Sequence, residues 1–259
     1  FDHNATTPLL PEVLAKMQPY FTEDFGNPSS IHAAGRRSRL AMDRSRESIA
    51  ALLGADPSEI LFTSGATEAN NLAIKGMALQ KGGGHLITSA VEHPSVLEPF
   101  RRLEKQGFAL SVIGVDAQGR ILSEAAESAL QADTFLVSIQ YANNEVGTIQ
   151  DVEAICRWAK GKGLLVHVDA AQAVGKVPVS LMALPADLVT FSAHKFYGPK
   201  GVGGLFVRRG VRLAGLLEGG SHEKRLRPGT ENVAGIVGMA AALEIAVRDM
   251  AEESRRLTK

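Results

Sequence analysis

The sequence is poor in cysteine and has no net charge. Its 259 residues include one cysteine, Cys156, which excludes an internal disulfide and any metal site built from several cysteines. The seven histidines form no His-x-x-x-His pair, so a zinc site is not expected either. Twenty-eight basic residues balance 28 acidic ones, which argues against nucleic acid or an anionic membrane as the main partner.

Long apolar runs are also missing. No stretch approaches the ~18 apolar residues of a transmembrane helix, and no signal peptide opens the chain. We therefore expect a cytoplasmic protein that does not contact a membrane. The chain begins at Phe1 without a methionine and stops at Lys259 inside a helical pattern, so we expect further sequence at both ends, chiefly at the C-terminus.

What the sequence does contain is an alternation of strand and helix patterns. Hydrophobic residues make up 45% of the chain, enough to fill the core of one large α/β domain with a piece of a second. Seven strand-length runs interleaved with helical spacing predict an α/β fold whose mostly parallel sheet is covered on both faces. The runs are residues 60–63, 85–89, 109–115, 135–140, 164–169, 186–191 and 204–207.

Two successive strands of this pattern end in charged side chains. The run 164–169 ends in Asp169, and the run 186–191 leads through Ser192 and His194 to Lys195 in a loop rich in Gly and Pro. An isolated lysine in a turn is usually only exposed, but open α/β sheets bind ligands at the ends of their strands. Pyridoxal phosphate chemistry needs this pair, a lysine for the Schiff base and a carboxylate that keeps the ring nitrogen protonated.

Two other strand ends carry candidate residues. Ser64-Gly65-Ala66-Thr67 opens a helix after the run 60–63, and its free backbone N–H groups and hydroxyls suit a phosphate. An ordinary capped helix is the alternative. His93 follows the run 85–89, where an imidazole can stack on a planar cofactor and move protons, although a lone histidine before a proline is more often a loop residue.

Two helical segments are assigned structural roles. In the helix 151–162, Cys156 falls on the apolar face with Ile155 and Ala159, so we expect it to be buried and inert. The helix 34–53 sets apolar residues against an arginine-rich face, which we expect to be solvated.

Together these motifs resemble the cysteine desulfurases of the NifS/IscS type, which are fold-type I pyridoxal phosphate enzymes of the class V aminotransferase family. The resemblance covers essentially the whole chain, and the form Asn-Asn-Glu-Val-Gly-Thr indicates this branch rather than the second desulfurase branch. The motifs, in order, are Asp2–Pro8, Asn27–His32, Phe62–Glu68, Ala142–Thr148, Ser192–Lys195 and Arg227–Asn232.

The resemblance implies a role for each site residue. Lys195 carries the cofactor and is catalytic, Asp169 pairs with the pyridine nitrogen, and His93 stacks on the ring and assists proton transfer. No metal is implied. Four further cofactor-binding residues are Ala66, Thr67, Ser192 and His194, and the last three hold the phosphate. Gln172 and Asn144 lie near the ring hydroxyl. Thr230 binds the cofactor from the partner subunit of a homodimer.

The resemblance also implies a division into domains. Residues 1–12 form an N-terminal segment of the small domain, 13–232 form the large cofactor-binding domain, and 233–259 form a helix that leads into a truncated small domain. The family's sulfur-accepting cysteine and the arginine that binds the substrate carboxylate lie beyond the point that matches Lys259. His3 and Ser221-His222 depart from the family's usual residues, away from the expected chemistry.

The implied activity is conversion of L-cysteine to L-alanine. The sulfur passes as an enzyme persulfide to an acceptor or scaffold protein, for iron–sulfur cluster assembly or tRNA thiolation. A selenocysteine lyase or another class V aminotransferase would use the same cofactor apparatus. A third alternative is a catalytically incomplete paralogue that only binds a partner.

Overall fold

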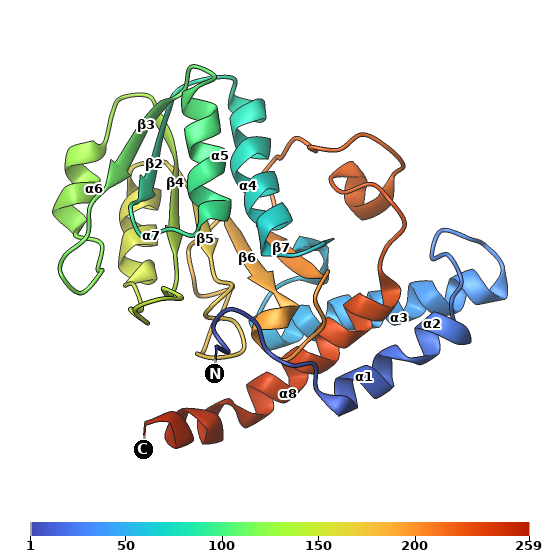
Figure 1. Cartoon of the computed structure of the whole chain (residues 1–259). Helices are drawn as coiled ribbons and strands as arrows, with labels where there is room; N and C mark the ends of the chain where they lie inside the picture. The colour runs from blue at the N-terminus through green and yellow to red at the C-terminus, as the bar shows by residue number, and fades with distance from the viewer. Residues whose placement is uncertain (1, 259) are drawn as a thin grey trace.

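A seven-stranded sheet forms the middle layer of the computed structural model, which describes residues 2–258 (Figure 1). Phe1 and Lys259, the outermost residues of the two predicted terminal segments, lie outside the described residues. The strands are β1 (Ile60–Thr63), β2 (His85–Ser89), β3 (Ala109–Ile113), β4 (Thr134–Gln140), β5 (Leu165–Asp169), β6 (Leu188–Ser192) and β7 (Gly203–Val207).

The sheet has the strand order β1-β7-β6-β5-β4-β2-β3. Strands β3, β2, β4, β5 and β6 pair in parallel, whereas β7 is antiparallel to both of its neighbours. Gly204 of β7 pairs with Phe191 of β6, and a Cβ atom at Gly204 would lie only 2.2 Å from the Phe191 ring. The prediction of a mostly parallel, seven-stranded sheet is confirmed.

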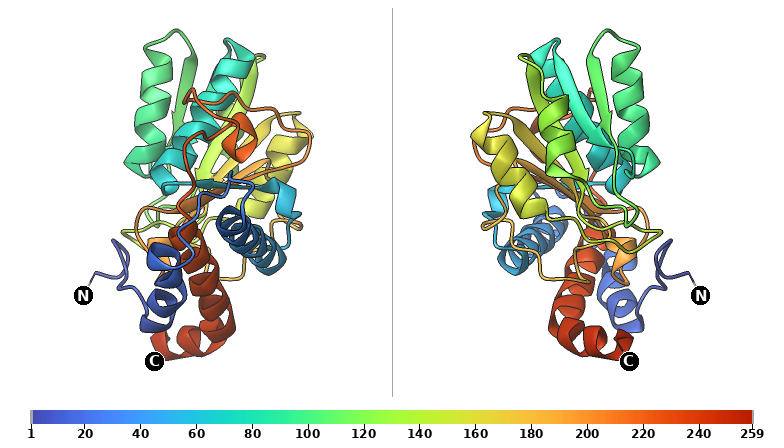
Figure 2. Two further views of the ribbon diagram at one scale, coloured as in Figure 1. Left: turned by 90° about the vertical axis from the view of Figure 1, so that its right-hand side faces the viewer. Right: turned by 90° about the vertical axis from the view of Figure 1, so that its left-hand side faces the viewer.

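Helices cover both faces of the sheet, as two side views show (Figure 2). One face packs against α4 and α5, and the other against α3, α7 and the first half of α8. The helices are α1 (Pro11–Met17), α2 (Pro19–Thr22), α3 (Ala33–Leu53), α4 (Ala66–Lys81), α5 (Pro94–Glu104), α6 (Ser123–Ala129), α7 (Val152–Gly161) and α8 (Val233–Leu257), with short 3-10 turns η1 (Pro57–Glu59), η2 (Ala193–Lys195) and η3 (His222–Arg225).

Successive strand residues point to opposite faces and fill two cores. In β2, Leu86 joins the core under α4 and α5, whereas Ile87 joins the core on the other side. The same alternation relates Leu188 to Val189 in β6 and Leu205 to Phe206 in β7. Because both faces are covered, these strands read as continuous apolar runs in the sequence, which is why they could be recognised.

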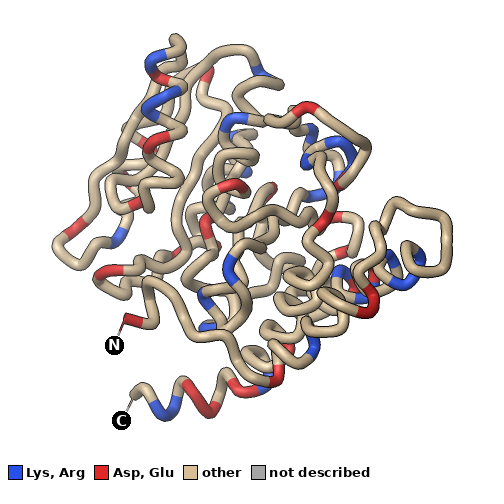
Figure 3. Tube along the Cα trace, turned by 45° about the vertical axis from the view of Figure 1, so that its right-hand side comes forward, with Lys and Arg blue, Asp and Glu red and all other residues tan. Residues whose placement is uncertain are grey.

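Helix α8 changes character along its length. Its first half, through Leu243, is buried against α3 and α1, while its later turns carry alternating charges and extend past the rest of the chain (Figure 3).

The division of the chain into domains at residues 12 and 232 stays a prediction. Within residues 2–258, no helix combines the length and apolar character that crossing a membrane requires.

One helical pattern is interrupted. The helical spacing that starts at Pro11 gives two short helices, because Pro19 lacks the N–H group that would continue the hydrogen bonds of α1. The run 109–115 is also shorter in the sheet, since β3 ends at Ile113 and Val115 makes only an isolated bridge to Ile121.

Candidate active site

The carboxyl ends of six strands, β1 to β6, lie at one edge of the sheet. The register places Gln140 of β4 beside Asp169 of β5, and Thr63 of β1 level with Ser192 of β6 through Gly203 of β7. Helices α4 and α5 begin at the same edge, after β1 and β2. Side chains that are far apart in the sequence are therefore gathered around one space.

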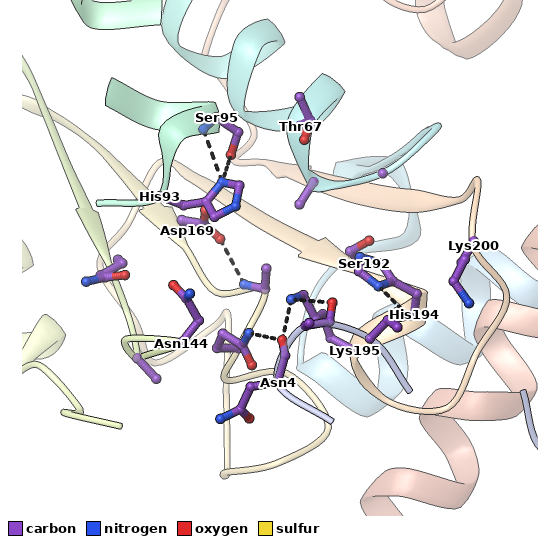
Figure 4. Close-up of a pocket in the computed structure, with 18 of the residues that line it drawn as sticks. Asn4, Thr67, His93, Ser95, Asn144, Asp169, Ser192, His194, Lys195 and Lys200 are labelled. Carbon is purple, nitrogen blue, oxygen red and sulfur yellow. Dashed lines mark hydrogen bonds between the residues drawn. The ribbon is translucent and has the colours of Figure 1, made fainter. Parts of the chain in front are cut away.

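That space is a cavity of about 860 Å³ (Figure 4). Its lining, drawn from residues 2–258, includes every predicted site residue except Thr230, which is exposed on the loop before α8. The predicted residues that line it are Ala66, Thr67, His93, Asn144, Asp169, Gln172, Ser192, His194 and Lys195.

Lys195 ends the short turn η2 that follows β6. Its Nζ donates to the backbone carbonyls of Asn4, at 2.5 Å, and Ala5, at 3.0 Å. Partial burial lowers the pKa of the Lys195 amine, and the carboxylates of Asp169 and Asp2 oppose that shift. A lowered pKa increases the fraction of neutral amine, the form that can act as a nucleophile.

The N-terminal segment is held against this lysine by its own contacts. Thr7 donates from both N and Oγ1 to the carbonyl of His194, and Thr7 Oγ1 accepts from the N–H of Tyr197 at 2.7 Å. The carbonyls of Asn4 and Ala5 thus reach the Lys195 amine from a segment 191 and 190 residues earlier in the chain, respectively.

Asp169 is the buried acid of the site, with 6% of its surface exposed. Its Oδ1 accepts from the N–H of Ala171 at 3.0 Å, and its Oδ2 accepts from Nδ2 of Asn70 at 2.8 Å. Burial raises the pKa of the Asp169 carboxyl, while these two donors and the nearby Lys195 act in the opposite direction. The carboxylate is therefore placed to pair with a cationic group in the cavity.

The other end of the cavity suits an anion. Ser192 Oγ, on a residue that is 1% exposed, has no hydrogen-bond partner among the described residues. Helix α4 begins beside it, and a Cβ atom at Gly65 would lie 3.8 Å from Ser192 Oγ. The first intrahelical bond of α4 runs from the N–H of Ala69 to the carbonyl of Gly65, so the preceding N–H groups of Ala66 and Thr67 remain available to a ligand.

His194 stands close to this end of the cavity. Its Nδ1 lies 3.2 Å from Oγ1 of Thr6. Burial lowers the pKa of His194, and the cationic side chains of Lys195 and Lys200 lower it further. A neutral His194 can donate one N–H to an anion.

His93 caps the start of α5. Its Nδ1 accepts from the backbone N–H of Ser95 at 3.1 Å and lies 2.8 Å from Ser95 Oγ (Figure 4). This bond fixes the ring at the edge of the sheet and leaves Nε2 for the cavity. Asn144 enters the lining from the loop after β4.

Gln172 is held from both sides of its amide. Its Nε2 donates to the carbonyl of Asn4 at 2.7 Å, and its Oε1 accepts from Nζ of Lys176 at 2.5 Å. Burial lowers the pKa of Lys176 to about 8, and the charge of Lys195 contributes to that shift. Lys176 thus sets which end of the Gln172 amide is the donor.

Sequence reasoning missed four residues of this arrangement, namely Asn4, Asn70, Ser95 and Lys176. Asn70 carried one usable signal, since it is a polar residue between Ala69 and Leu72 on the buried face of α4. Lys176 lies only four residues after Gln172, but nothing in the sequence assigned it a role. Asn4 lies in the Asp2–Pro8 motif, and its contacts with Gln172 and Lys195 join segments that only the folded chain brings together.

Comparisons with known proteins agree with the geometry. The family model described as Aminotransferase class-V matches residues 1–259. The cysteine desulfurase IscS of Dictyoglomus turgidum is 50% identical over 260 residues, which is 100% of this chain and 66% of that protein. The cysteine desulfurase IscS of Serratia proteamaculans is 49% identical over 263 residues, 99% of this chain and 65% of that protein. The chain thus spans just under two thirds of the length of these curated relatives.

Solved structures extend the agreement to the fold. A structure titled NifS-like protein matches with a TM-score of 0.95 at 48% identity, covering 97% of this chain and 70% of that one. A structure titled SspA in complex with cysteine matches with a TM-score of 0.92 at 42% identity, covering 94% of this chain and 72% of that one. Fold and site together are those of the fold-type I pyridoxal phosphate enzymes. The chain belongs to the class V aminotransferase family.

The residues present fit this cofactor. Its aldehyde needs an amine, its ring nitrogen a carboxylate and its phosphate a set of donors. Lys195, Asp169 and the unpartnered Ser192 hydroxyl beside the start of α4 provide these groups on one cavity.

Proposed function

We propose that this chain is the cofactor-binding part of a cysteine desulfurase whose substrate is L-cysteine. The observation that carries the proposal is one cavity that joins a strand-end amine, a buried carboxylate and an unpartnered hydroxyl. The names of the relatives support the choice of substrate, because they are cysteine desulfurases and one similar structure is titled as a complex with cysteine.

The proposed reaction balances without an added oxidant or reductant. L-Cysteine and a thiol give L-alanine and a persulfide: the C–S bond of cysteine breaks, an S–S bond forms, and a hydrogen replaces sulfur on the β-carbon. Bound pyridoxal phosphate supplies an electron sink that lets the α-proton of the amino acid leave.

In this proposal the protein's residues divide into holding and proton-transfer groups. Ser192, Thr67 and His194 hold the phosphate with the N–H groups at the start of α4, and Asp169 holds the proton on the ring nitrogen. Gln172 and Asn144 lie toward the ring hydroxyl. Lys195 anchors the cofactor through Nζ, and its lowered pKa suits an amine that must also accept a proton.

The thiol that receives the sulfur is not Cys156 in this proposal. Cys156 is buried in the core on α7, and burial raises the pKa of its thiol to about 12. A thiol with that pKa is almost entirely protonated at neutral pH, and the thiolate is the nucleophile. The sulfur acceptor is therefore another thiol of the complete protein or of a partner.

Three further parts of the proposal concern the setting of the reaction. The enzyme acts as a homodimer, it works in the cytoplasm, and it passes sulfur to an acceptor or scaffold protein for iron–sulfur cluster assembly or tRNA thiolation. The IscS names of the relatives support iron–sulfur cluster assembly as the destination of the sulfur.

Labelling with borohydride tests the cofactor assignment. The complete protein is loaded with pyridoxal phosphate, reduced with borohydride and digested, and the labelled peptide is mapped. We expect the label on Lys195 and none on Lys200, which also lines the cavity. A label on Lys200 contradicts the assignment, and Lys195→Ala serves as the unlabelled control.

Product analysis tests the reaction. The loaded protein is given L-cysteine with a reducing thiol, and the amino-acid and sulfur products are measured. L-Alanine with persulfide or sulfide, in equal amounts, is expected. A keto acid indicates transamination instead, and release of alanine only from selenocysteine indicates a lyase.

A further inference from the structure

A hydrogen-bonded chain of side chains joins the buried acid of the site to its histidine. Asn70 lies fully buried on α4, and Ser95 lies in the first turn of α5. We propose that Asn70 is a positioning residue, which donates one amide hydrogen to Asp169 and the other to Ser95 and so sets Asp169 and His93 in a single network. This inference rests on the proposed function, because it assigns Asn70 a part in that reaction.

The orientation of the Asn70 amide is determined by its neighbours. Its Nδ2 lies 2.8 Å from Oδ2 of Asp169 and 2.9 Å from Oγ of Ser95. An ionised carboxylate can only accept hydrogen bonds, so the opposite orientation would aim Oδ1 at Asp169 and lose that bond. Both hydrogens of the amide are therefore used, each toward a different element.

The direction of the next hydrogen bond follows from the first. Ser95 Oγ accepts from Asn70, so its own hydrogen is free to donate to His93 Nδ1, 2.8 Å away. The backbone N–H of Ser95 donates to the same ring nitrogen at 3.1 Å. With two donors directed at Nδ1, the neutral ring of His93 keeps its hydrogen on Nε2, the nitrogen left for the cavity.

The network joins three separate elements at the point where the cofactor ring is expected. Asp169 ends β5, Asn70 comes from the second turn of α4, and Ser95 with His93 comes from the start of α5. A shift of any one element would break a bond to a buried group. Asn70 therefore fixes the acid and the histidine relative to each other as well as to the sheet.

Asparagine at position 70 leaves one buried polar atom unsatisfied, and the hydrogen bonds that its amide donates account for why it is there. Asn70 Oδ1 is buried without a hydrogen-bond partner among the described residues. A leucine of similar size would avoid that unsatisfied carbonyl. An unsatisfied buried group kept next to a reactive site is expected when its other atoms serve the chemistry.

The substitution Asn70→Leu separates a positioning role from a structural one. We expect the variant to fold, because loss of the unsatisfied carbonyl offsets part of the cost of removing a donor from the buried Asp169 carboxylate. In the cofactor-free protein, the ¹³C signal of the Asp169 carboxyl should titrate at a higher pH, because one donor to the carboxylate is lost. In the loaded enzyme, exchange of the substrate α-proton for deuterium should slow by about tenfold or more.

Two outcomes decide against the proposal. A titration of Asp169 that is unchanged in folded Asn70→Leu overturns it, as does an exchange rate equal to that of the wild type. The matched control is Asn71→Leu, on the same helical turn, where the lost bond goes only to the carbonyl of Thr67 and both readouts should stay unchanged.

The unmodified protein provides a test that does not depend on the variant folding. The two Nδ2 hydrogens of Asn70 should give separate, slowly exchanging NMR signals, and one of them should shift as Asp169 titrates. If neither shifts, the bond to Asp169 is absent and the proposal fails. These measurements use cofactor-free protein, so they stand even if the loaded enzyme proves to have another activity.

The variant Ser95→Ala tests the second half of the network. It removes the hydroxyl link to His93 and leaves the bond between Asn70 and Asp169. We expect the ¹⁵N signals of the His93 ring to move in the cofactor-free variant, while the titration of Asp169 stays that of the wild type. A change at Asp169 equal to that in Asn70→Leu, or no change at His93, contradicts the proposed order of contacts.

Discussion

The carboxyl group of Glu92 is buried where β2 and β4 end. Its Oε1 accepts from Oγ of Ser89 at 2.5 Å and from the N–H of Gln140 at 2.8 Å, while Oε2 has no partner among the described residues. Burial raises the pKa of Glu92 from 4.5 to about 8, and the carboxylate of Asp169 adds to the shift. Glu92 is therefore a neutral acid at physiological pH, directly before His93 in the chain.

This raised pKa predicts how stability depends on pH. Below pH 4.5, Glu92 is protonated in both the folded and the unfolded chain. As the pH rises to about 8, the unfolded chain releases the proton that the folded chain keeps, so stability falls through that window. Glu92→Gln should remove this part of the pH dependence and stabilise the protein above pH 8, by at most about 5 kcal/mol. Urea denaturation at pH 5, 7 and 9 measures it.

The control for Glu92 is an exposed residue of the same type. Glu98→Gln changes a glutamate that pairs with Arg101 on the surface of α5, and the slope of stability against pH should remain that of the wild type. Equal slopes for Glu92→Gln and the wild type would show that Glu92 ionises normally in the folded protein.

Cys156 gives a second prediction for a single residue. Cys156→Ser should lower stability by about 1 to 3 kcal/mol, because a hydroxyl is placed among apolar side chains without a designed partner. Cys156→Ala should lower the free energy of unfolding less than Cys156→Ser does, because alanine places no unsatisfied polar group in the core. In the complete, loaded protein both variants should keep desulfurase turnover. Loss of persulfide in a variant that remains folded and loaded would assign Cys156 a catalytic role.

The sequence predicted those site residues that lie where an apolar strand pattern ends. Lys195, Asp169 and the start of α4 follow from where apolar runs stop, and the structure brings them to one cavity. The partners that tune them did not follow. Asn70 and Ser95 meet across α4, α5 and β5, and no spacing in the sequence records that contact.

Among the elements, the seven strands and a helix that begins at residue 233 were predicted, but the structural role of η3 was not. Glu223, Lys224 and Arg225 are consecutive non-glycine residues with φ of 42°, 59° and 65°. Each left-handed residue of this kind costs roughly 1 kcal/mol or more, so the surrounding contacts must hold the turn.

The contact that holds η3 is a buried ion pair with α3. Glu223 accepts from Nη2 of Arg46 at 2.6 Å and from Nη1 at 3.0 Å, and its Oε2 also accepts from the N–H of Phe62. The Arg46 guanidinium lies over the Phe62 ring, and its side chain is only 15% exposed. The expectation that the arginine-rich face of α3 is solvated is therefore wrong for Arg46, because its partner lies 177 residues later in the chain.

Glu223→Gln tests this element. The variant leaves the Arg46 guanidinium poorly paired and removes one acceptor of the turn, so we expect a loss of about 3 kcal/mol in the free energy of unfolding. Glu253→Gln is the matched control, since Glu253 pairs with Arg256 on the exposed end of α8, where the loss should not be measurable. Equal losses in the two variants would mean that η3 is held by other contacts.

At the scale of the whole molecule, η3 leads directly into the segment that carries Thr230. The Arg227 side chain donates to Glu68 at 2.9 Å, and Glu68 accepts from the N–H of Ser64 at the start of α4. These contacts fix the base of the loop beside the cavity, yet Thr230 itself is exposed and outside the lining formed by the described residues. An exposed threonine on a positioned loop is what a contribution to a second subunit would require, although Thr before a helix is also an ordinary surface residue.

The final prediction is that Thr230 completes the phosphate site of the partner subunit in a homodimer. Chains with Lys195→Ala are mixed with chains with Thr230→Val, and binding of pyridoxal phosphate is measured. If Thr230 acts between subunits, the Thr230→Val subunit of a mixed dimer has its own lysine and an intact threonine from its partner. That one site should then bind with wild-type affinity, while the Thr230→Val homodimer binds more weakly, by about tenfold for one lost bond to a charged phosphate. A mixed dimer that binds no better than the Thr230→Val homodimer would show that Thr230 does not act across the interface.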